Sequence, residues 1–253
     1  MIQKQSNQNS LNSEKKWIVQ PVQEAGIDQL VEALKISHLQ AHLLVNRGID
    51  APESAYAFLH STLKDLYDPY LMKDMRRTVD RIMRAIHQRE NILIYGDFDV
   101  DGVTSIVVLK KTIQLLGGVC GFYIPRRLTD GYGLKKEAIE EFKHQGYSLV
   151  ISVDCGIRAT EVAEFTREIG LDLIVTDHHL PSDALPPAYS ILNPRQADCA
   201  YPDKNLAGVG VVFKLCQALL REDGREEQAG QFLSFVAIGT VADLVSLSDE
   251  NRI

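Results

Sequence analysis

The sequence predicts an α/β fold in which helices cover both faces of a parallel β-sheet and a helical extension precedes the sheet. Two observations predict it. Short apolar runs alternate with longer amphipathic stretches from residue 91 onward, and glycines follow those stretches where a helix would end. Parallel sheets buried on both faces are built from such units. With 253 residues, the chain is long enough for one large α/β domain and a small extension.

The N-terminal part of the chain is predicted to carry no chemistry. Residues 1–16 are polar and lack the apolar core of a signal peptide, so we expect a disordered tail on a cytoplasmic protein. Residues 17–90 are expected to form the helical extension, with Pro52 at a helix start. The expected helices, which carry apolar residues at helical spacing, are Ile27–Lys35, His38–Arg47, Ala51–Leu59 and Asp74–Arg89.

Residues 91–253 are expected to form the sheet domain. The expected strands are Ile92–Tyr95, Val119–Ile124, Leu149–Val153, Leu171–Thr176 and Tyr189–Leu192. The expected helices between the strands are Val103–Leu116, Leu134–Gln145 and Arg158–Ile169. Residues 206–247 look mainly helical, with Gly208 and Gly210 at the first helix start and a second helix over Phe232–Val241. Ligands of such sheets bind at the carboxyl ends of the strands, so the residues that follow each strand are the candidate site.

Composition indicates a globular protein and leaves the substrate open. Hydrophobic residues make up 45% and charged residues 24%, both ordinary values, and no apolar run approaches the roughly 20 residues of a membrane span. The four cysteines lack the paired spacing of a zinc site or a disulfide framework, so reduced thiols are expected. The net charge of −7 weakly disfavours a nucleic-acid partner. Divalent cations would offset much of that charge, and basic pairs remain at Lys110-Lys111, Arg126-Arg127 and Lys135-Lys136.

Three aspartates follow the first expected strand at alternate positions: Asp97, Asp99 and Asp101. They could form an acidic surface turn, because aspartate is common in turns. Like charges this close together repel one another, however, and a strand end holds them partly out of water. A divalent cation is the usual compensation for such a cluster.

Acidic or imidazole side chains also follow other elements. Asp154 ends the third expected strand, the run Asp177-His178-His179 ends the fourth, and Asp243 ends the last helix. Each could be a local cap or a polar turn when taken alone. Because parallel strands end at one edge of the sheet, the groups are expected to converge there. Carboxylates with imidazole suit Mn²⁺, and Mg²⁺ is an alternative. Two ions about 4 Å apart would serve an in-line displacement at phosphorus.

These motifs resemble those of a known family. The segments DFDVDG (97–102), VDCG (153–156), DHH (177–179) and AD (242–243) resemble the four motifs of the DHH phosphoesterase superfamily. Within it, IPRR (124–127), DGYGL (130–134), LNP (192–194), LAGVGV (206–211) and GTVAD (239–243) resemble the RecJ group of single-stranded-DNA exonucleases. The resemblance runs from about residue 30 to the last residue. Asp130 stands where relatives often have Glu or Asn.

The resemblance also sets an expectation for the domain organisation. RecJ proteins continue into a second substrate-binding domain (DHHA1) and an oligonucleotide-binding (OB) fold, and no Gly-Gly-His motif of the second domain occurs here. Residues 91–253 are therefore expected to be the catalytic DHH domain, with the C-terminal DHHA1 and OB domains absent.

Chemistry and resemblance together suggest roles for the candidate residues. Asp154 is expected to bridge two ions. The expected metal ligands are Asp97 and Asp99 for one ion and Asp101, His178 and Asp243 for the other, with Asp177 either ligating directly or orienting His178. The family pattern places His179 at the scissile phosphate rather than on a metal, so Asp154 and His179 are the expected catalytic residues. A water whose pKa is lowered by the ions would be the nucleophile.

Three further features suggest substrate contacts. Arg126 and Arg127 follow a strand and match phosphate oxygens, although they could be a solvated basic pair. Tyr132 lies between two glycines and could stack on a base. Gly208 and Gly210 could expose backbone N–H groups to a phosphate or could serve close helix packing.

The resemblance implies a 5′-to-3′ exonuclease that hydrolyses single-stranded DNA with two Mn²⁺ or Mg²⁺ ions during DNA repair and recombination. It also implies a cytoplasmic monomer that works with a single-strand-binding protein or a helicase. Two alternatives stay open. One is a DHH phosphoesterase acting on short oligonucleotides, cyclic dinucleotides or pyrophosphate, which the arginine pair and the Gly-Tyr-Gly segment disfavour. The other is a metal-free scaffold, which the complete set of candidate ligands disfavours.

Overall fold

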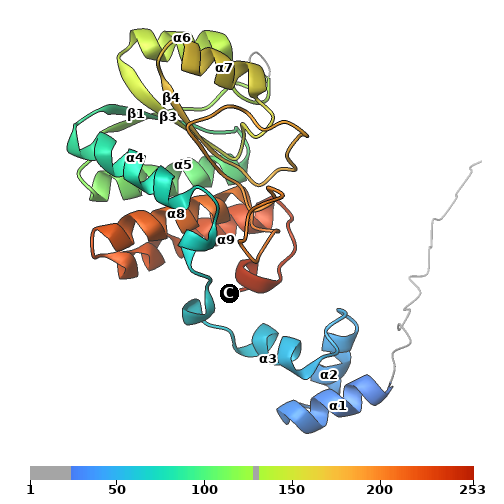
Figure 1. Ribbon diagram of the computed structural model, residues 1–253. Coiled ribbons are helices and arrows are strands. Elements are labelled where there is room, and N and C mark those ends of the chain that lie inside the picture. Colours follow the sequence, from blue (N-terminus) through green and yellow to red (C-terminus); the bar gives the residue numbers. More distant parts are fainter. Residues whose placement is uncertain (1–23, 128–130) are drawn as a thin grey trace, which may run out of the picture. The chain divides into compact units, whose positions relative to one another are not determined.

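The computed structural model describes residues 24–127 and 131–253, and these fall into two compact units (Figure 1). The first unit ends at Ser61 and the second begins at Thr62. The helices of the first unit are α1 (Glu24–Leu34), α2 (His38–Val45) and α3 (Pro52–His60). A small core of Ile27, Leu30, Ala41, Leu44 and Ala55 holds these helices together. The tail expected over residues 1–16 lies outside the described residues.

The second unit is built on a five-stranded sheet, and the expected α/β fold with a parallel sheet is confirmed. The strands are β1 (Asn91–Tyr95), β2 (Cys120–Tyr123), β3 (Tyr147–Val153), β4 (Asp172–Thr176) and β5 (Ser190–Leu192). They run in the order β2-β1-β3-β4-β5, and every neighbouring pair is parallel. The strand boundaries lie within one or two residues of those expected from the sequence.

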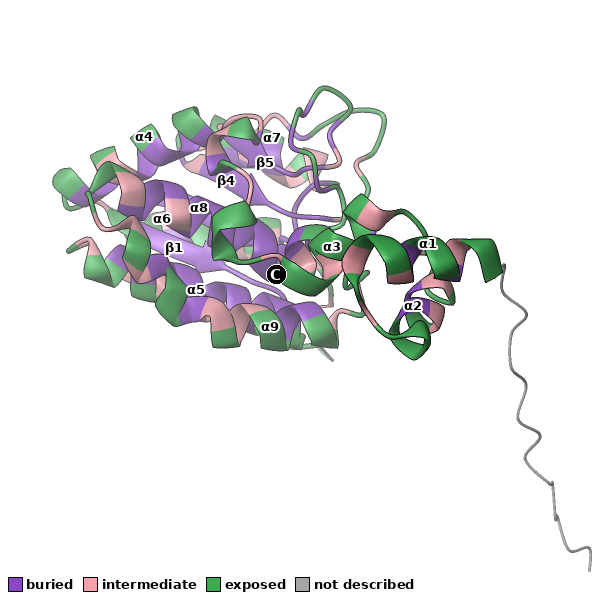
Figure 2. Ribbon diagram, turned by 90° about the horizontal axis from the view of Figure 1, so that it is seen from below, coloured by how far each residue is buried: buried purple, intermediate pink, exposed green. Residues whose placement is uncertain are grey.

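Helices cover both faces of the sheet (Figure 1). The helices are α4 (Met75–His87), α5 (Val100–Leu115), α6 (Lys136–His144), α7 (Thr160–Glu168), α8 (Gly208–Glu222) and α9 (Leu233–Ala242), and 3₁₀ turns lie at Leu63–Asp65, Pro69–Leu71, Glu226–Phe232 and Asp249–Asn251. Along β1, Ile92 and Ile94 pack with α4, α5 and α8, while Leu93 and Tyr95 pack with α6 and α7. Strands β1, β3, β4 and β5 are therefore largely buried on both sides, as their continuous apolar runs require, whereas the edge strand β2 is only partly buried (Figure 2).

Helix α4 belongs to the larger unit, although the sequence grouped it with the extension. Its Met75, Val79 and Ile82 are buried in the same cluster as the sheet residues. Arg81, also buried, binds Glu90 and Asp172 at the amino ends of β1 and β4. These contacts tie α4 to the sheet on the edge opposite to the strand ends that carry the motifs.

The connections place the candidate site at a switch point in the topology. The chain passes from β1 through α5 to β2 on one face, and then through α6 to β3 on the other face. The ends of β1 and β3 therefore lie side by side where the direction of winding reverses, and this is where ligands of open α/β sheets bind. The glycines expected to end three helices, Gly117, Gly146 and Gly170, all have positive φ angles.

Among the described residues, no helix is both long and apolar enough to cross a membrane.

Candidate metal centre

The three aspartates after β1 separate into different environments. Asp97 is buried, and one of its oxygens accepts the Phe98 N–H at 2.7 Å. Asp99 is exposed and caps the start of α5 by accepting the Gly102 N–H at 2.9 Å. Asp101, in the first turn of α5, is 1% exposed. The tight turn needs Gly102, since a Cβ there would lie 2.6 Å from the Asp97 carbonyl oxygen.

Asp101 is held by the start of α8. Its two oxygens accept the N–H groups of Gly208 and Val209, each at 2.7 Å. Free N–H groups and the positive end of the helix dipole favour a carboxylate at this position. Burial nevertheless raises the pKa of Asp101 to about 6, and the two amide hydrogen bonds oppose that rise. Asp101 is thus fixed in place without a neutralising side chain.

Asp154 occupies the most constrained position of the site. It follows β3 with a φ of 59°, in the left-handed region that few non-glycine residues adopt. Its N–H donates to the Thr176 carbonyl at 2.9 Å, which holds this conformation at the end of the sheet. The side chain is 2% exposed, and its Oδ1 atom has no hydrogen-bond partner. Burial, followed by repulsion from Asp101 and Asp99, raises the pKa of Asp154 to about 10.

His178 lies among three carboxylates. Its Nε2 atom is 3.2 Å from Asp154 Oδ1, 3.6 Å from Asp243 Oδ2 and 3.9 Å from Asp101 Oδ2. None of these approaches has hydrogen-bond geometry, and both buried ring nitrogens lack a hydrogen-bond partner. Buried polar atoms are normally satisfied, so partnerless nitrogen and oxygen atoms that face one another fit a site for a divalent cation.

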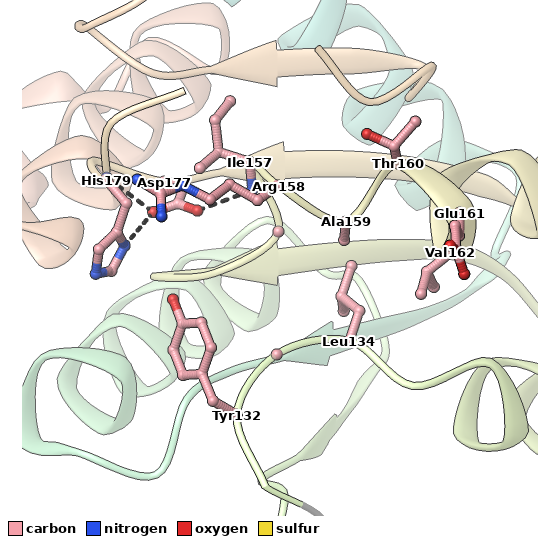
Figure 3. A pocket seen from close by; sticks show the side chains of 12 residues that line it. Tyr132, Leu134, Ile157, Arg158, Ala159, Thr160, Glu161, Val162, Asp177 and His179 are labelled. Carbon is pink, nitrogen blue, oxygen red and sulfur yellow. Dashed lines mark hydrogen bonds and ion pairs between the residues drawn. The ribbon is translucent and has the colours of Figure 1, made fainter. Parts of the chain in front are cut away.

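Asp177 has a different role from its neighbours. One oxygen accepts from the His178 and His179 N–H groups and from His179 Nδ1, and the other accepts the Ile157 N–H at 2.9 Å (Figure 3). Burial raises the pKa of Asp177, but these hydrogen bonds lower it further. The sequence left open whether Asp177 binds a metal or orients His178. The ring it holds is that of His179, at 2.7 Å.

The donor atoms of the site form three groups in which all atoms lie within 4.8 Å of one another. The groups are Asp97, Asp99 and Asp154; Asp101, His178 and Asp243; and Asp154, His178 and His179. Asp154 and His178 each occur twice, and Asp177 occurs in none. Hard carboxylate oxygens with one or two imidazoles suit Mn²⁺. Mg²⁺, which prefers oxygen ligands, is the alternative. Together with the unsatisfied atoms of Asp154 and His178, the donor set fits divalent cations.

Residues 91–240 match the model of the DHH family, N-terminal domain. The chain belongs to the DHH family. The matched region begins at β1 and ends in α9, so it contains every candidate metal ligand described above except one. The exception, Asp243, lies just beyond the matched region.

Several relatives of this DHH chain carry one name. This chain is 48% identical over 243 residues to the single-stranded-DNA-specific exonuclease RecJ of Bacillus subtilis, and the match covers 96% of this chain and 30% of the relative. It is 36% identical over 226 residues to RecJ of Escherichia coli, covering 85% of this chain and 38% of the relative. The chain thus spans about a third of the length of these relatives.

Solved structures give the same grouping. A crystal structure of exonuclease RecJ bound to manganese matches 76% of this chain and 47% of its own with a TM-score of 0.68 and 31% identity. RecJ from Thermus thermophilus in complex with Mn²⁺ matches 91% of this chain and 32% of its own with a TM-score of 0.74 and 28% identity.

The expected substrate contacts lie beside the metal centre of the DHH domain. The Arg127 guanidinium lies over the Phe98 ring, 5.2 Å from its centre, and opposes the rise that burial causes in the pKa of Asp97. Arg126 is exposed next to it. The Tyr132 ring meets the His179 ring edge to face, with the ring centres 6.1 Å apart. Asp130 lies outside the described residues.

A cavity of about 640 Å³ opens beside His179 (Figure 3). The segment Tyr132–Leu134, before α6, and the segment Gly156–Val162, which runs into the first turn of α7, form its walls, and Asp177 and His179 lie at one end. Its lining is mixed: Leu134, Ile157, Ala159 and Val162 contribute apolar side chains, and Arg158, Thr160 and Glu161 contribute polar ones. The hydrogen bond to the Asp177 carboxylate raises the pKa of His179 to about 9, although partial burial of the imidazole opposes this rise.

Sequence reasoning missed the part played by three residues near the carboxylates. The Gly208 N–H was considered for a substrate phosphate, but together with the Val209 N–H it is used by Asp101. Gly239 of α9 packs against Thr104 and Asp101 so closely that a Cβ would lie 2.4 Å from Thr104 Oγ1. The glycines in LAGVGV and GTVAD were the available signals, but glycine alone does not say which atoms approach it.

Proposed function

We propose that this chain is the catalytic part of a metal-dependent phosphodiesterase that removes nucleotides from the 5′ end of single-stranded DNA. The observation that carries the proposal is the buried Asp154 carboxylate, which has an unsatisfied oxygen and faces both a second acidic group and an imidazole. The relatives named RecJ support the choice of substrate, and their manganese-bound structures support Mn²⁺ as the metal. Mg²⁺ is the alternative.

We assign the metal ligands as two sets that share Asp154. Asp97 and Asp99 would hold one ion, and Asp101, His178 and Asp243 the other. The grouping of their donor atoms supports this division. Bound divalent cations would lower the pKa of a coordinated water and offset negative charge on the phosphate. We assign Asp177 a supporting role, because both its oxygens are engaged by Ile157, His178 and His179 and it belongs to none of the three donor groups.

His179 is proposed to bind the scissile phosphate. The Asp177 carboxylate holds Nδ1, which leaves Nε2 free to donate toward a phosphate oxygen. The same carboxylate favours the charged imidazolium, which would attract an anionic substrate. The half-exposed side chain is accessible from the cavity.

Arg126, Arg127 and Tyr132 are proposed to position the strand. Burial raises the pKa of Asp97, and Arg127 lies close enough to oppose that rise, so its guanidinium could reach a phosphate that enters the centre. Tyr132 lines the cavity beside His179, where a nucleoside next to the scissile phosphate could stack on its ring. Stacking on an aromatic ring is tolerant of base sequence, which suits an exonuclease.

The biological setting follows from the family resemblance. We propose that the protein acts in DNA repair and recombination in the cytoplasm, as a monomer, alongside a single-strand-binding protein or a helicase. In the whole protein, the function would also involve the further DHHA1 and OB domains that are typical of RecJ proteins.

The proposal is tested with a 5′-phosphorylated single-stranded oligonucleotide, a duplex of the same sequence, a linear dinucleotide and a cyclic dinucleotide, each with Mn²⁺. We expect mononucleotides from the single strand, little cleavage of the duplex and no activity in excess EDTA. A strong preference for either dinucleotide would favour the alternative phosphoesterase. A chain that binds no Mn²⁺ in a metal titration would favour the scaffold.

A further inference from the structure

Gly208, the first residue of α8, lies between the two proposed sets of ligands. Its N–H donates to Asp101 Oδ2 at 2.7 Å. On the other side, a Cβ atom placed on Gly208 would lie 2.6 Å from Asp154 Oδ1 and 2.9 Å from Asp154 Cβ and Cγ. Real Cβ contacts are essentially never shorter than 3.0 Å, so a side chain here would displace the Asp154 carboxylate or move α8.

Backbone conformation does not explain this glycine. Its φ angle lies outside the left-handed region, so any residue could adopt the backbone at this helix start. The available space is therefore the reason that only glycine fits. Asp154 cannot easily yield, because its own φ of 59° and its N–H bond to Thr176 fix the direction of its side chain.

We propose that Gly208 is a positioning residue that sets the distance between the Asp101 and Asp154 carboxylates and thereby the spacing of the two metal sites. Its amide fixes one carboxylate and its bare Cα leaves room for the other. The inference rests on the proposed two-metal function and adds a residue that touches neither metal nor substrate.

The test compares Gly208→Ala with Gly210→Ala in the 253-residue chain. Gly210 is the matched control, because it lies two residues further along α8 and the three atoms nearest to a Cβ there all belong to Leu206, at 3.3 Å or more. We expect Gly208→Ala to weaken Mn²⁺ binding by about 10- to 100-fold, as measured by the electron paramagnetic resonance signal of free Mn²⁺. Gly210→Ala should bind Mn²⁺ as the parent chain does.

Kinetics give a second readout. At saturating Mn²⁺, Gly208→Ala should lower kcat and leave KM for the oligonucleotide near the parent value, because Gly208 contacts metal ligands and not the strand. Equal Mn²⁺ affinity in the two glycine variants would overturn the inference and would leave the proposed function untouched. Conversely, a chain without nuclease activity could still show the Mn²⁺ difference, so the two ideas fail separately.

A third measurement covers the case in which Gly208→Ala folds poorly. The thermal stability in EDTA of Gly208→Ala is compared in the parent and in an Asp154→Gly background, which removes the Asp154 Cβ as well as the carboxylate and suits the φ of 59°. If the new methyl group clashes with the Asp154 carboxylate, most of the loss should disappear in that background, as a coupling between the two positions. An additive loss would assign the effect to α8 alone and would contradict the inference.

Discussion

Asp154 combines two unfavourable features in one residue, a left-handed backbone and a buried carboxylate with an unsatisfied oxygen. Each costs folding free energy, and such outliers persist only where surrounding contacts enforce them. Here the enforcing contact is the continuation of the sheet, through the Asp154 N–H and the Thr176 carbonyl. The sheet therefore holds the Asp154 carboxylate in a position where it can bind a cation.

Replacing Asp154 should separate activity from stability. We expect Asp154→Asn to reduce Mn²⁺-dependent cleavage by about 100-fold or more, because the bridging negative charge is lost. Asparagine tolerates the left-handed conformation and removes the repulsion from Asp101, so the metal-free variant should be at least as stable as the parent. Cleavage assays and thermal unfolding in EDTA measure the two effects.

A second buried aspartate outside the site gives the control. Asp203 is 3% exposed and burial raises its pKa, but it belongs to none of the donor groups. Asp203→Asn should keep its Mn²⁺-dependent activity. If Asp154→Asn cleaved the oligonucleotide at the parent rate, the bridging role would be wrong.

Spacing along the chain was enough to predict which residues meet, but it could not predict their contacts. A parallel sheet brings its carboxyl ends together, so Asp97, Asp154 and His178 could be placed at one edge. The partner of Asp177 was not predictable, because backbone torsions at the end of β4 decide which imidazole turns toward it. Gly208 was ambiguous for a similar reason, since a missing side chain leaves no chemical signature in the sequence.

At the scale of single elements, α8 is buried almost all round, as expected for a helix that packs between a sheet and other helices. One charged side chain of this helix is buried. Lys214 is 1% exposed, and its ammonium donates to Glu250 at 2.8 Å and to the Tyr67 carbonyl at 2.7 Å. Glu250 also bonds the Tyr67 N–H and the Tyr201 hydroxyl. This buried pair joins α8 to segments far away in the sequence.

Breaking the Lys214–Glu250 pair should be costly. Glu250→Ala leaves a buried ammonium without its carboxylate, and we expect a loss of about 3–5 kcal/mol in unfolding free energy. Glu250→Gln keeps an acceptor and should lose less. Urea unfolding measures both. In the exposed Lys73–Asp198 pair, Asp198→Ala should change the unfolding free energy far less, because solvent screens the pair. Equal losses at the two pairs would contradict the importance of burial.

The ion pairs of α4 should give a stability that depends on pH. Arg81 donates to both oxygens of Glu90 at 3.1 and 2.7 Å and to Asp172 at 2.6 Å. Burial raises the pKa of Glu90, but Arg81 and Ser148 lower it further, below its usual value of 4.5. A carboxyl whose pKa is lowered by folding adds stability above its usual pKa and loses that contribution as the pH falls through the folded value.

We therefore expect Glu90→Gln to destabilise the protein by about 1–3 kcal/mol at neutral pH. The difference from the parent should shrink progressively below about pH 4, where the parent carboxyl also becomes neutral. Urea unfolding of both proteins across this pH range provides the measurement. A difference that stays constant down to the acid limit would mean that the ion pair does not act through the charge of Glu90.

For the molecule as a whole, the strands and helices of the sheet domain were predicted more closely than the boundary of that domain. Apolar runs and glycines at helix ends placed the strands and α5, α6 and α7 to within a few residues, because burial on two faces leaves a strong pattern. The strand order needs contacts between distant segments, which a local pattern does not contain. The assignment of α4 to the larger unit depends on the same kind of contact.

Metal removal should destabilise the larger unit. The centre gathers carboxylates that repel one another, and burial and repulsion raise the pKa values of Asp97, Asp101 and Asp154. Mn²⁺ at about 100 times its dissociation constant should add about 2.7 kcal/mol. For a unit of this size that corresponds to a rise in Tm of roughly 5–10 °C. Thermal unfolding with Mn²⁺ and with EDTA measures the change, and Ca²⁺ provides a comparison ion.

An Asp154→Asn variant should show a much smaller rise in Tm with Mn²⁺ than the parent. An unchanged Tm in the parent chain would mean that the centre binds no metal under these conditions.

The wide separation of the ligands along the chain has a consequence for synthesis. Asp97 is made early and Asp243 much later, and α5 packs against both α8 and α9, which follow it at a distance in the sequence. At about 5–20 residues per second, a ribosome needs roughly 7 to 30 seconds between the two aspartates. A nascent chain that has not yet reached the end of α9 lacks Asp243 and therefore one ligand of the second proposed set. We therefore expect nuclease activity only from chains whose translation has passed that helix.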